Sequence, residues 1–178
     1  MRAFIAVEIS DEVRKNITKI EKAMEEELPS DKIKIVDPQL IHITLKFLGE
    51  IDESKVEGIK EALSSIKFSP ITLKCKGVGV FPNEKFIRVI WVGIEEDNEL
   101  HRLKKIADEV EEKMGALGFG KSDYPFSPHI TIGRAKAKVE IANFLRKYKD
   151  TDFGKFTVDE IKLKKSTLTQ KGPIYEDV

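Results

Sequence analysis

Residues 40–50, LIHITLKFLGE, place His42 two residues before Thr44 in an apolar run. Residues 127–136, SPHITIGRAK, repeat the arrangement with His129 and Thr131, 129 − 42 = 87 residues later. Two of the three histidines in the chain therefore stand in nearly the same four-residue sequence. The segments around them recur in the same order, so we interpret the two motifs as equivalent positions of an internal duplication.

Each half of the chain has the pattern strand, helix, strand, helix, strand. The first half has alternating apolar segments at 3–9, 41–49 and 70–81, and helical spacing at 10–28 and 52–66. The second half has strands at 86–94, 128–136 and 154–169, and helices at 95–118 and 138–149. Aligning Ile5 with Ile90 gives an offset of 90 − 5 = 85, close to the 87 between the histidines. This order predicts an α+β fold with two pseudo-symmetric lobes, each a mostly antiparallel sheet backed by helices, which face each other across a central cleft.

The length and composition of the chain favour a single bilobal domain over residues 1–178, in which both halves share one core. No segment has the ~20 consecutive apolar residues that a membrane span requires. The N-terminus turns acidic after a short apolar stretch, unlike a signal peptide, so we expect a cytoplasmic monomer with no membrane partner. Basic and acidic residues balance at 31 each, so net charge alone does not indicate a nucleic-acid-binding protein.

Both histidines are predicted to share a strand face with the threonine of their own motif. Alternate residues of a strand point to the same side, so His42, Thr44 and Lys46 are expected to lie on one face. The opposite face takes the apolar residues Ile43, Leu45 and Phe47. His129 and Thr131 are opposed in the same way by Ile130 and Ile132. Each half thus presents an imidazole beside a hydroxyl, and facing lobes would bring both pairs to one cleft.

Two imidazoles on opposite walls of a cleft suit an in-line displacement at phosphorus. One ring removes a proton from the attacking oxygen while the other protonates the leaving oxygen, and a pKa near neutrality serves both roles. The hydroxyls of Thr44 and Thr131 are suited to donate hydrogen bonds to the non-bridging phosphate oxygens. Arg134, five residues after His129, is the nearest candidate for a positive side chain.

Other interpretations have weaker support in the sequence. A single strand histidine is usually structural, and one ancestral pair would explain both motifs, yet two of three histidines followed by Thr at i+2 is a rare coincidence. A metal site needs three or four ligands, and only Asp37 and Asp123 lie near the two histidines, so we predict no metal. No GxxxxGK[ST] loop is present to bind a nucleoside triphosphate. His101 lies in a charged helical stretch and is expected to be a solvated surface residue.

The tetrapeptides HITL and HITI match the paired His-x-Thr-x signature of the two-histidine phosphoesterase superfamily. The start MRAFIAVEI, the extension HITLKFLGEI, the second motif PHITIGRAK and the end STLTQKGPIYEDV resemble more narrowly the RNA 2′,3′-cyclic phosphodiesterases, also called 2′,5′ RNA ligases. The resemblance extends over essentially the whole chain. One His-x-Thr is weak evidence by itself, but the pair, its separation and its flanks together are specific.

The resemblance implies a bilobal α+β fold and an activity on RNA ends that needs no metal, cofactor or nucleoside triphosphate. Members of the family hydrolyse a terminal 2′,3′-cyclic phosphate to a 2′-phosphate, and some join that end reversibly to a 5′-hydroxyl in a 2′,5′ linkage, as with tRNA halves. By matching positions, His42 and His129 become the catalytic pair, and Thr44 and Thr131 bind the phosphate. As the family is usually described, His42 would be the acid and His129 the base, an order that the sequence does not determine.

Two other functions stay open from the sequence. The physiological role could be RNA ligation, in which a bound 5′-hydroxyl excludes water from the same site. Alternatively, the chain could be a module that binds RNA or nucleotides without turnover. The first alternative changes what occupies one side of the cleft, and the second removes catalysis altogether.

Arg134 also matches the basic position that follows the second motif of the family. Strict alternation along the strand sends its side chain to the face opposite His129. A bulge, which Gly133 would permit, turns it back toward the cleft. The alternative is a surface or structural arginine.

Further residues have two interpretations each. Phe4, and Trp91 with Arg88 at the corresponding place in the second half, are candidates for stacking on a base, although core packing is the usual role of such rings. Lys46 either assists with phosphate or is a solvated lysine. Residues 162–172, KLKKSTLTQKG, either guide an RNA backbone or protect a strand edge with charged side chains.

Overall fold

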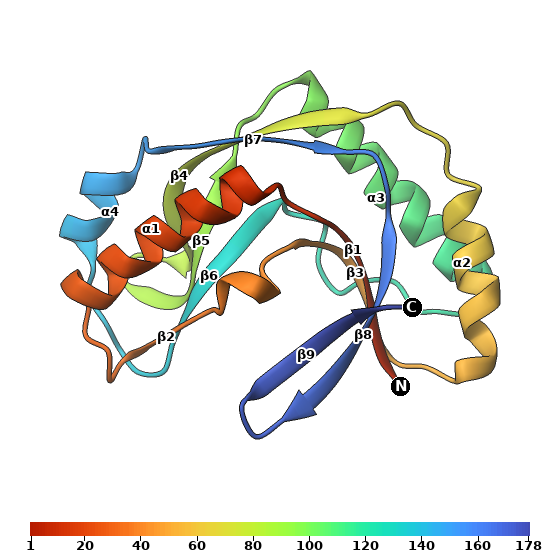
Figure 1. Ribbon diagram of the computed structural model, residues 1–178, viewed down its shortest axis with the longest axis horizontal. Helices are drawn as coiled ribbons and strands as arrows, with labels where there is room; N and C mark the ends of the chain where they lie inside the picture. The colour runs from red at the N-terminus through yellow and green to blue at the C-terminus, as the bar shows by residue number, and fades with distance from the viewer.

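The strands form two antiparallel sheets in the computed structural model, which describes residues 1–178 (Figure 1). Sheet A has, in spatial order, β3 (Ile43–Glu50), β1 (Arg2–Val7), β8 (Lys162–Thr169) and β9 (Gly172–Asp177). Sheet B has β2 (Ile33–Ile35), β6 (His129–Ala135), β5 (Phe86–Ile94), β4 (Ile71–Asn83) and β7 (Asp152–Val158). The predicted α+β class with two mostly antiparallel sheets is confirmed.

The helices occupy the segments where helical spacing predicts them. They are α1 (Asp11–Glu27), α2 (Val56–Ser64), α3 (Asn98–Ala116) and α4 (Ala142–Tyr148), with short 3-10 turns η1 (Pro38–Leu40) and η2 (Glu53–Lys55). α1 packs on β7 and β2 of sheet B, whereas α3 contacts both β4 of sheet B and β3 of sheet A. α1 and α4 lie toward one end of the molecule and α2 and α3 toward the other (Figure 1).

α1 begins after an N-cap at Ser10. The Ser10 hydroxyl accepts a hydrogen bond from the Val13 backbone N–H, which satisfies a donor that the helix leaves free. Glu21 is the charged residue of α1 that is buried: its side chain is 3% exposed, and neither carboxylate oxygen has a hydrogen-bond partner. Burial, with repulsion from Asp37 and Glu25, raises the pKa of Glu21 to about 8. The carboxyl group is therefore largely neutral at pH 7.

The two sheets exchange strands between the halves of the chain. β4 ends the first half but pairs with β5 in sheet B, and β8 ends the second half but pairs with β1 in sheet A. The single strand region predicted at 154–169 is wrong in this respect, because residues 159–161 leave sheet B and cross to sheet A. Each sheet therefore contains strands from both halves of the sequence.

Two edge strands, β2 and β9, are not predicted by the sequence patterns. β2 is only three residues long, which is too short for a period to be recognised. β9 returns from β8 through a tight turn that ends at Gly172, whose φ of 112° lies in the region that favours glycine. The lysine and glycine of this turn fall within the basic segment 162–172, where charge rather than turn formation dominates the pattern.

The duplication is visible in the pairing of the strands. Ile5 of β1 lies opposite Lys46 of β3, and Ile90 of β5 lies opposite Gly133 of β6. The second pair is displaced from the first by 90 − 5 = 85 and 133 − 46 = 87 residues, the same offsets found along the sequence. β1 with β3 and β5 with β6 therefore share one register.

A β-bulge interrupts both ladders at equivalent positions, three residues after each histidine. Leu45 has no partner on β1, and Ile132 has none on β5. An extra residue in one strand reverses the alternation of side chains beyond it. Phe47 and Arg134, five residues after each histidine, are thereby returned to the face of the histidine and threonine. The ring of Phe47 lies 6.2 Å from that of Phe4, its cross-strand partner.

The strict alternation predicted for residues 41–49 is wrong beyond the bulge at Leu45. That pattern places Lys46 beside His42 and Phe47 on the apolar side. In the structure, Lys46 is only 3% exposed and reaches α3, whereas Phe47 is 75% exposed. The reversal follows from the unpaired Leu45, which the strand sequence does not mark.

One hydrophobic cluster of 39 buried residues draws on both sheets. It includes Ile5 and Ile43 of sheet A and Ile90 and Ile130 of sheet B, all at most 1% exposed. The two histidine-bearing strands are therefore fixed on opposite parts of the same core. None of the helices is long and apolar enough to span a bilayer.

The ring of Trp91 packs against Gly79 of β4 and Gly93 of β5, because neither glycine has a side chain to occupy that space. A Cβ built on Gly79 would overlap ring atoms of Trp91, whereas one built on Gly58, inside α2, meets nothing within 4 Å. We expect Gly79→Ala to lower the free energy of unfolding by about 1–3 kcal/mol through this overlap. Gly58→Ala should raise it by about 0.5–1 kcal/mol through helix propensity. Urea unfolding of both variants tests the prediction, and a Gly79→Ala protein as stable as wild type would contradict it.

Candidate active site

His42 lies immediately before β3 and makes two short contacts through its ring. Nδ1 is 2.7 Å from the Leu40 carbonyl oxygen, and Nε2 is 2.7 Å from Thr44 Oγ1. A carbonyl oxygen only accepts, so Nδ1 carries the proton in the neutral ring and Nε2 holds the lone pair. The Thr44 hydroxyl then donates to Nε2. The predicted pairing of His42 with Thr44 is therefore present as a direct contact.

His129, at the start of β6, has the same orientation. Its Nδ1 is 2.6 Å from the carbonyl oxygen of Ser127, two residues upstream. Leu40, which contacts Nδ1 of His42, is also two residues upstream of its histidine. The neutral ring again carries its proton on Nδ1 and leaves the lone pair on Nε2. Thr131 shares the strand face with His129. Both imidazoles are thus held in one tautomer by the backbone, with the lone pair on Nε2, and in His42 this lone pair accepts from the Thr44 hydroxyl.

Aromatic rings surround both imidazoles. Phe4 of β1 stacks on His42 with ring centroids 4.8 Å apart, and Tyr175 of β9 meets His42 edge-on at 5.4 Å. Phe81 of β4 meets His129 edge-on at 5.0 Å. Phe4 is only 4% exposed, so it serves both the core and the wall of the site. The sequence indicates Tyr175 only as part of the C-terminal stretch STLTQKGPIYEDV, and no motif indicates Phe81.

The pKa values of both histidines lie below the ordinary 6.5. For His42 the main cause is burial, which the Leu40 carbonyl opposes and the charge of Lys164 reinforces. For His129 burial again dominates, the Ser127 carbonyl opposes it, and Arg134 reinforces it. Both rings are therefore mostly neutral at pH 7 in the free protein, and a bound anion would favour their protonated forms.

Arg134 lies on the same face as Thr131 because of the bulge at Ile132, next to Gly133. Its side chain is exposed and takes part in no ion pair. Its charge is the smallest of the causes that act on the pKa of His129, after burial and the Ser127 carbonyl, and it lowers that pKa. The expected return of Arg134 toward the histidine is thus present in the geometry.

Lys46 has neither of the roles that the sequence suggests. Its ammonium group contacts Glu111 Oε2 of α3 at 2.9 Å, the Gly120 carbonyl at 2.9 Å and Ser122 Oγ at 3.2 Å. All three N–H donors are therefore used inside the protein, so Lys46 is neither solvated nor free to bind phosphate. Gly120 and Ser122 belong to the loop that leads to His129, so Lys46 ties the strand after His42 to that loop.

A second link joins the two motifs. The Val36 backbone N–H donates to the carbonyl of the bulged Ile132 at 2.9 Å, and the chain then runs through η1 to His42. The Arg14 guanidinium of α1 holds this segment by donating to the carbonyls of Pro38 and Ile41. The position of His42 is therefore anchored to the strand that carries His129.

Trp91 and Arg88 are not brought together as a base-stacking pair. Trp91 packs over the glycines of β4 and β5 and contacts Phe81 at 5.3 Å, so it supports the wall beside His129. Arg88 instead lies over the ring of Phe86, 5.1 Å from its centroid, near the β4–β5 turn. Trp91 is half-buried on the face of Thr131, its cross-strand partner, and lies outside the hydrophobic cluster, so the core-packing interpretation of this residue is wrong.

The basic charge of the segment 162–172 is compensated in part, since Lys162 and Lys164 are paired with carboxylates and Lys165 and Lys171 take part in no ion pair. Lys162 pairs with Asp177 at 3.0 Å, and Lys164 pairs with Asp177 at 2.8 Å and with Glu8. These strand lysines of sheet A thus offer little free positive charge to an RNA backbone. Arg134, on the sheet B side, has no such carboxylate partner.

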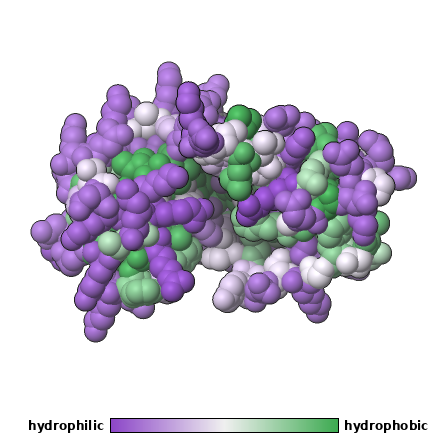
Figure 2. Space-filling model, turned by 90° about the horizontal axis from the view of Figure 1, so that it is seen from below, coloured by the Kyte–Doolittle hydropathy of each residue, from purple (hydrophilic) through white to green (hydrophobic).

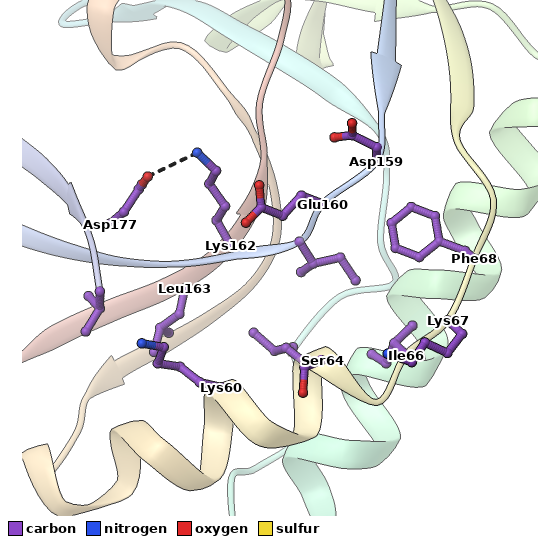
Figure 3. A pocket seen from close by; sticks show the side chains of 13 residues that line it. Lys60, Ser64, Ile66, Lys67, Phe68, Asp159, Glu160, Lys162, Leu163 and Asp177 are labelled. Atoms are coloured by element: carbon purple, nitrogen blue, oxygen red, sulfur yellow. Dashed lines mark hydrogen bonds and ion pairs between the residues drawn. The ribbon is translucent and has the colours of Figure 1, made fainter.

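Two cavities lie apart from the histidine motifs. One of about 480 Å³ is bounded by α2, the β7–β8 crossing and the end of β9, and residues of both charges line it, including Lys60, Glu160 and Asp177 (Figure 3). A more open one of about 800 Å³ lies between the β4–β5 turn and α4.

Seen from below, the surface is hollowed between two masses of the molecule (Figure 2). No group of three or more His, Cys, Asp and Glu side chains is gathered to hold a metal ion.

The ion pair between the buried Lys46 and the half-buried Glu111 makes a prediction for stability. Lys46→Met leaves the Glu111 carboxylate and the Gly120 carbonyl without their donor, and we expect a loss of about 1–3 kcal/mol in the free energy of unfolding. Removing the carboxylate as well, in Lys46→Met/Glu111→Leu, should recover part of that loss. Urea denaturation measures both, with Lys105→Met on the exposed face of α3 as the matched control. Equal stability of Lys46→Met and Lys105→Met would refute a structural role for Lys46.

The charge of Arg134 makes a prediction for titration. Arg134→Gln removes a cation that disfavours protonation of His129, so the pKa of His129 should rise toward 6.5 while burial still holds it lower. The pKa of His42 should change little. Titration of the imidazole protons by NMR reports both values, and Arg88→Gln is the control for loss of an exposed arginine on the same sheet. An unchanged His129 would show that Arg134 does not face it.

Comparison with known proteins gives the context of this geometry. A family model described as the AKAP7 2′5′ RNA ligase-like domain matches residues 3–177. The RNA 2′,3′-cyclic phosphodiesterase of Archaeoglobus fulgidus is 43% identical, with 100% of this chain and 98% of the relative covered. The enzyme of the same name from Methanocaldococcus jannaschii is also 43% identical, with 99% and 97% covered.

Solved structures share the fold over the full length. A protein of Thermus thermophilus superposes with a TM-score of 0.78 at 31% identity and covers 100% of this chain and 95% of its own. Escherichia coli LigT complexed with 3′-AMP gives a TM-score of 0.81 at 24% identity, with 99% and 94% covered. The matched family model spans nearly every residue, and the relatives align from end to end. The chain therefore belongs to the 2′,5′ RNA ligase-like family, in which the RNA 2′,3′-cyclic phosphodiesterases are its relatives.

Proposed function

We propose that the protein is an RNA 2′,3′-cyclic phosphodiesterase that converts terminal cyclic phosphates to 2′-phosphates by paired histidine catalysis. The observation that carries the proposal is the matched orientation of His42 and His129, each held through Nδ1 by a backbone carbonyl two residues upstream. Relatives that carry this enzyme name align over the whole chain, which supports the same activity here. The complex of LigT with 3′-AMP supports a nucleotide-sized ligand for this fold.

The proposed reaction forms one bond to phosphorus and breaks another. A water oxygen attacks phosphorus while the P–O3′ bond breaks, so the phosphate stays on O2′. One imidazole takes a proton from the water through Nε2, and the other gives a proton from Nε2 to the departing O3′. The two rings thus exchange protonation states in each turnover and are reset by solvent. Following the usual family description, we assign the acid to His42 and the base to His129.

The protein groups around the rings serve the charge on the phosphate. In this scheme the hydroxyls of Thr44 and Thr131 donate to the non-bridging oxygens, and Arg134 offsets their charge. No step requires a metal or cofactor, because both proton transfers are made by the imidazoles. Both histidines come from one chain, so we propose a monomer of residues 1–178 acting as one unit on RNA ends in the cytoplasm.

The same chemistry run with another nucleophile gives ligation. A 5′-hydroxyl in place of water would attack the cyclic phosphate and leave a 2′,5′ linkage, and the reverse step would use the same two rings with their roles exchanged. Water is abundant, so joining requires that the 5′-hydroxyl be held where water would otherwise attack. We propose hydrolysis as the main reaction, with reversible joining of ends such as tRNA halves as a second outcome of the same site.

Turnover of a defined RNA end tests the catalytic pair. The substrate is an oligoribonucleotide ending in a 2′,3′-cyclic phosphate, with EDTA present and the 2′- and 3′-phosphate products resolved. Wild type should form the 2′-phosphate, and His42→Ala and His129→Ala should each lose at least ~100-fold in kcat. His101→Ala, which removes an exposed histidine of α3, is the control and should keep wild-type activity.

Other outcomes separate the alternatives. Product that forms only when a second RNA with a 5′-hydroxyl is added would favour ligation as the main activity. Binding of the RNA end without any turnover would indicate a recognition module, and histidine variants as active as wild type would rule out the mechanism. Activity abolished by EDTA and restored by a divalent cation would contradict the metal-independent scheme.

A further inference from the structure

Arg14 is a half-buried cation in the first turn of α1 that the proposed mechanism does not use. Its side chain is 18% exposed, and its Nη1 atom donates to the Pro38 carbonyl and, at 3.3 Å, to the Ile41 carbonyl. Its one ion pair, with Glu8, is long at 3.9 Å. The guanidinium therefore serves mainly to hold two backbone carbonyls and only weakly to pair with a carboxylate.

The two carbonyls lie on either side of the one that orients His42. Pro38 and Ile41 flank Leu40, whose carbonyl oxygen is 2.7 Å from Nδ1 of His42. This short segment is the turn η1, and the hydrogen bonds of a 3-10 turn have poorer geometry than those of an α-helix. A guanidinium that grips both ends of the turn therefore fixes the direction in which the Leu40 carbonyl points.

The segment before His129 has no corresponding support. The Ser127 carbonyl orients this ring, yet no side chain other than that of His129 forms a hydrogen bond with residues 123–128. Lys46 reaches the same loop farther upstream. A change at Arg14 therefore acts on one imidazole and leaves the other as an internal reference.

We propose that Arg14 is a positioning residue for catalysis, which holds the Leu40 carbonyl against Nδ1 of His42 and so keeps Nε2 of that ring directed at the departing O3′. This inference rests on the proposed function, in which His42 is the acid. A ring released at Nδ1 can rotate or change tautomer, and either change moves the proton away from the leaving oxygen. Arg14 touches neither substrate nor reacting atoms, so its loss should lower kcat and leave KM nearly unchanged.

The kinetic experiment uses an oligoribonucleotide with a 2′,3′-cyclic phosphate end. We expect Arg14→Met to lower kcat about 10- to 100-fold, with KM within about twofold of wild type. Arg14→Lys keeps the charge and a donor on a shorter side chain, so it should recover part of the activity. Arg102→Met is the matched control and should keep wild-type kcat. Arg102 of α3 also donates to two backbone carbonyls, those of Ser69 and Pro70, in a segment that carries no histidine.

The pKa of His42 separates positioning from a simple effect of charge. Burial lowers this pKa most and the Leu40 carbonyl raises it, whereas the charges of Lys164, Glu8 and Arg14 have smaller effects. The charge of Arg14 lowers it. If Arg14→Met releases the carbonyl, the loss of the larger contribution outweighs the loss of the cation, and the pKa should fall. If the arginine acts through its charge alone, the pKa should rise. NMR titration of the imidazole protons distinguishes the two.

The outcomes separate this inference from the function on which it rests. Urea denaturation first identifies a temperature at which all variants are folded. A folded Arg14→Met protein as active as wild type, or an equal loss in Arg102→Met, would overturn the positioning role and leave the hydrolase intact.

The titration also decides the matter if wild type turns over no cyclic phosphate. In that case a fall in the pKa of His42 in Arg14→Met, with His129 unchanged, still supports a ring held through the arginine. A rise in that pKa, or no change, refutes it.

Discussion

The structure depends on the exchange of one strand between the two halves of the chain. β8 completes the sheet built on β1, and β4 completes the sheet built on β5, so each central strand is flanked by a strand from the other half. Without the exchange, both central strands would expose an unpaired edge. The pairing also joins the two sheets to one hydrophobic cluster, which holds β3 and β6 in a fixed relation. The mutual placement of the two histidines is therefore a property of the whole chain.

Local sequence patterns predict most of the helices and strands, whereas the pairing of the strands depends on contacts between residues far apart in the chain. The offsets of 85 and 87 residues identify equivalent strands, and the helical spacing at 10–28 predicts a helix that forms as α1. The exchange of β4 and β8 is not predictable, because an alternating strand pairs equally well with either sheet until the helices are packed. The bulges escape prediction for a similar reason, since Leu45 and Ile132 are ordinary strand residues whose lack of a partner is decided across the sheet.

The residues of the candidate site also divide into those that the sequence indicates and those that only the tertiary structure reveals. The motifs alone indicate both imidazoles and their threonines, because residues i and i+2 of a strand share a face whatever the sheet. The ion pair of Lys46 with Glu111 joins residues 65 positions apart, and the stacking of Phe4 on His42 requires two strands to pair. Such contacts are tertiary, so the sequence suggests a phosphate-binding or a solvated Lys46 and indicates no role for Tyr175. A single unpaired residue was enough to exchange the expected sides of Lys46 and Phe47.

The pseudo-symmetry of the two walls is broken in a way that suits a ligand with two different ends. Phe47 in sheet A corresponds to Arg134 in sheet B, while Lys164 in sheet A corresponds to Phe81 in sheet B. Each histidine thus has one aromatic ring and one cation at equivalent positions, but in exchanged places. Carboxylates pair with Lys164, whereas Arg134 takes part in no ion pair. A backbone with the same register in both halves thus carries an unpaired cation beside one histidine and an exposed aromatic ring beside the other.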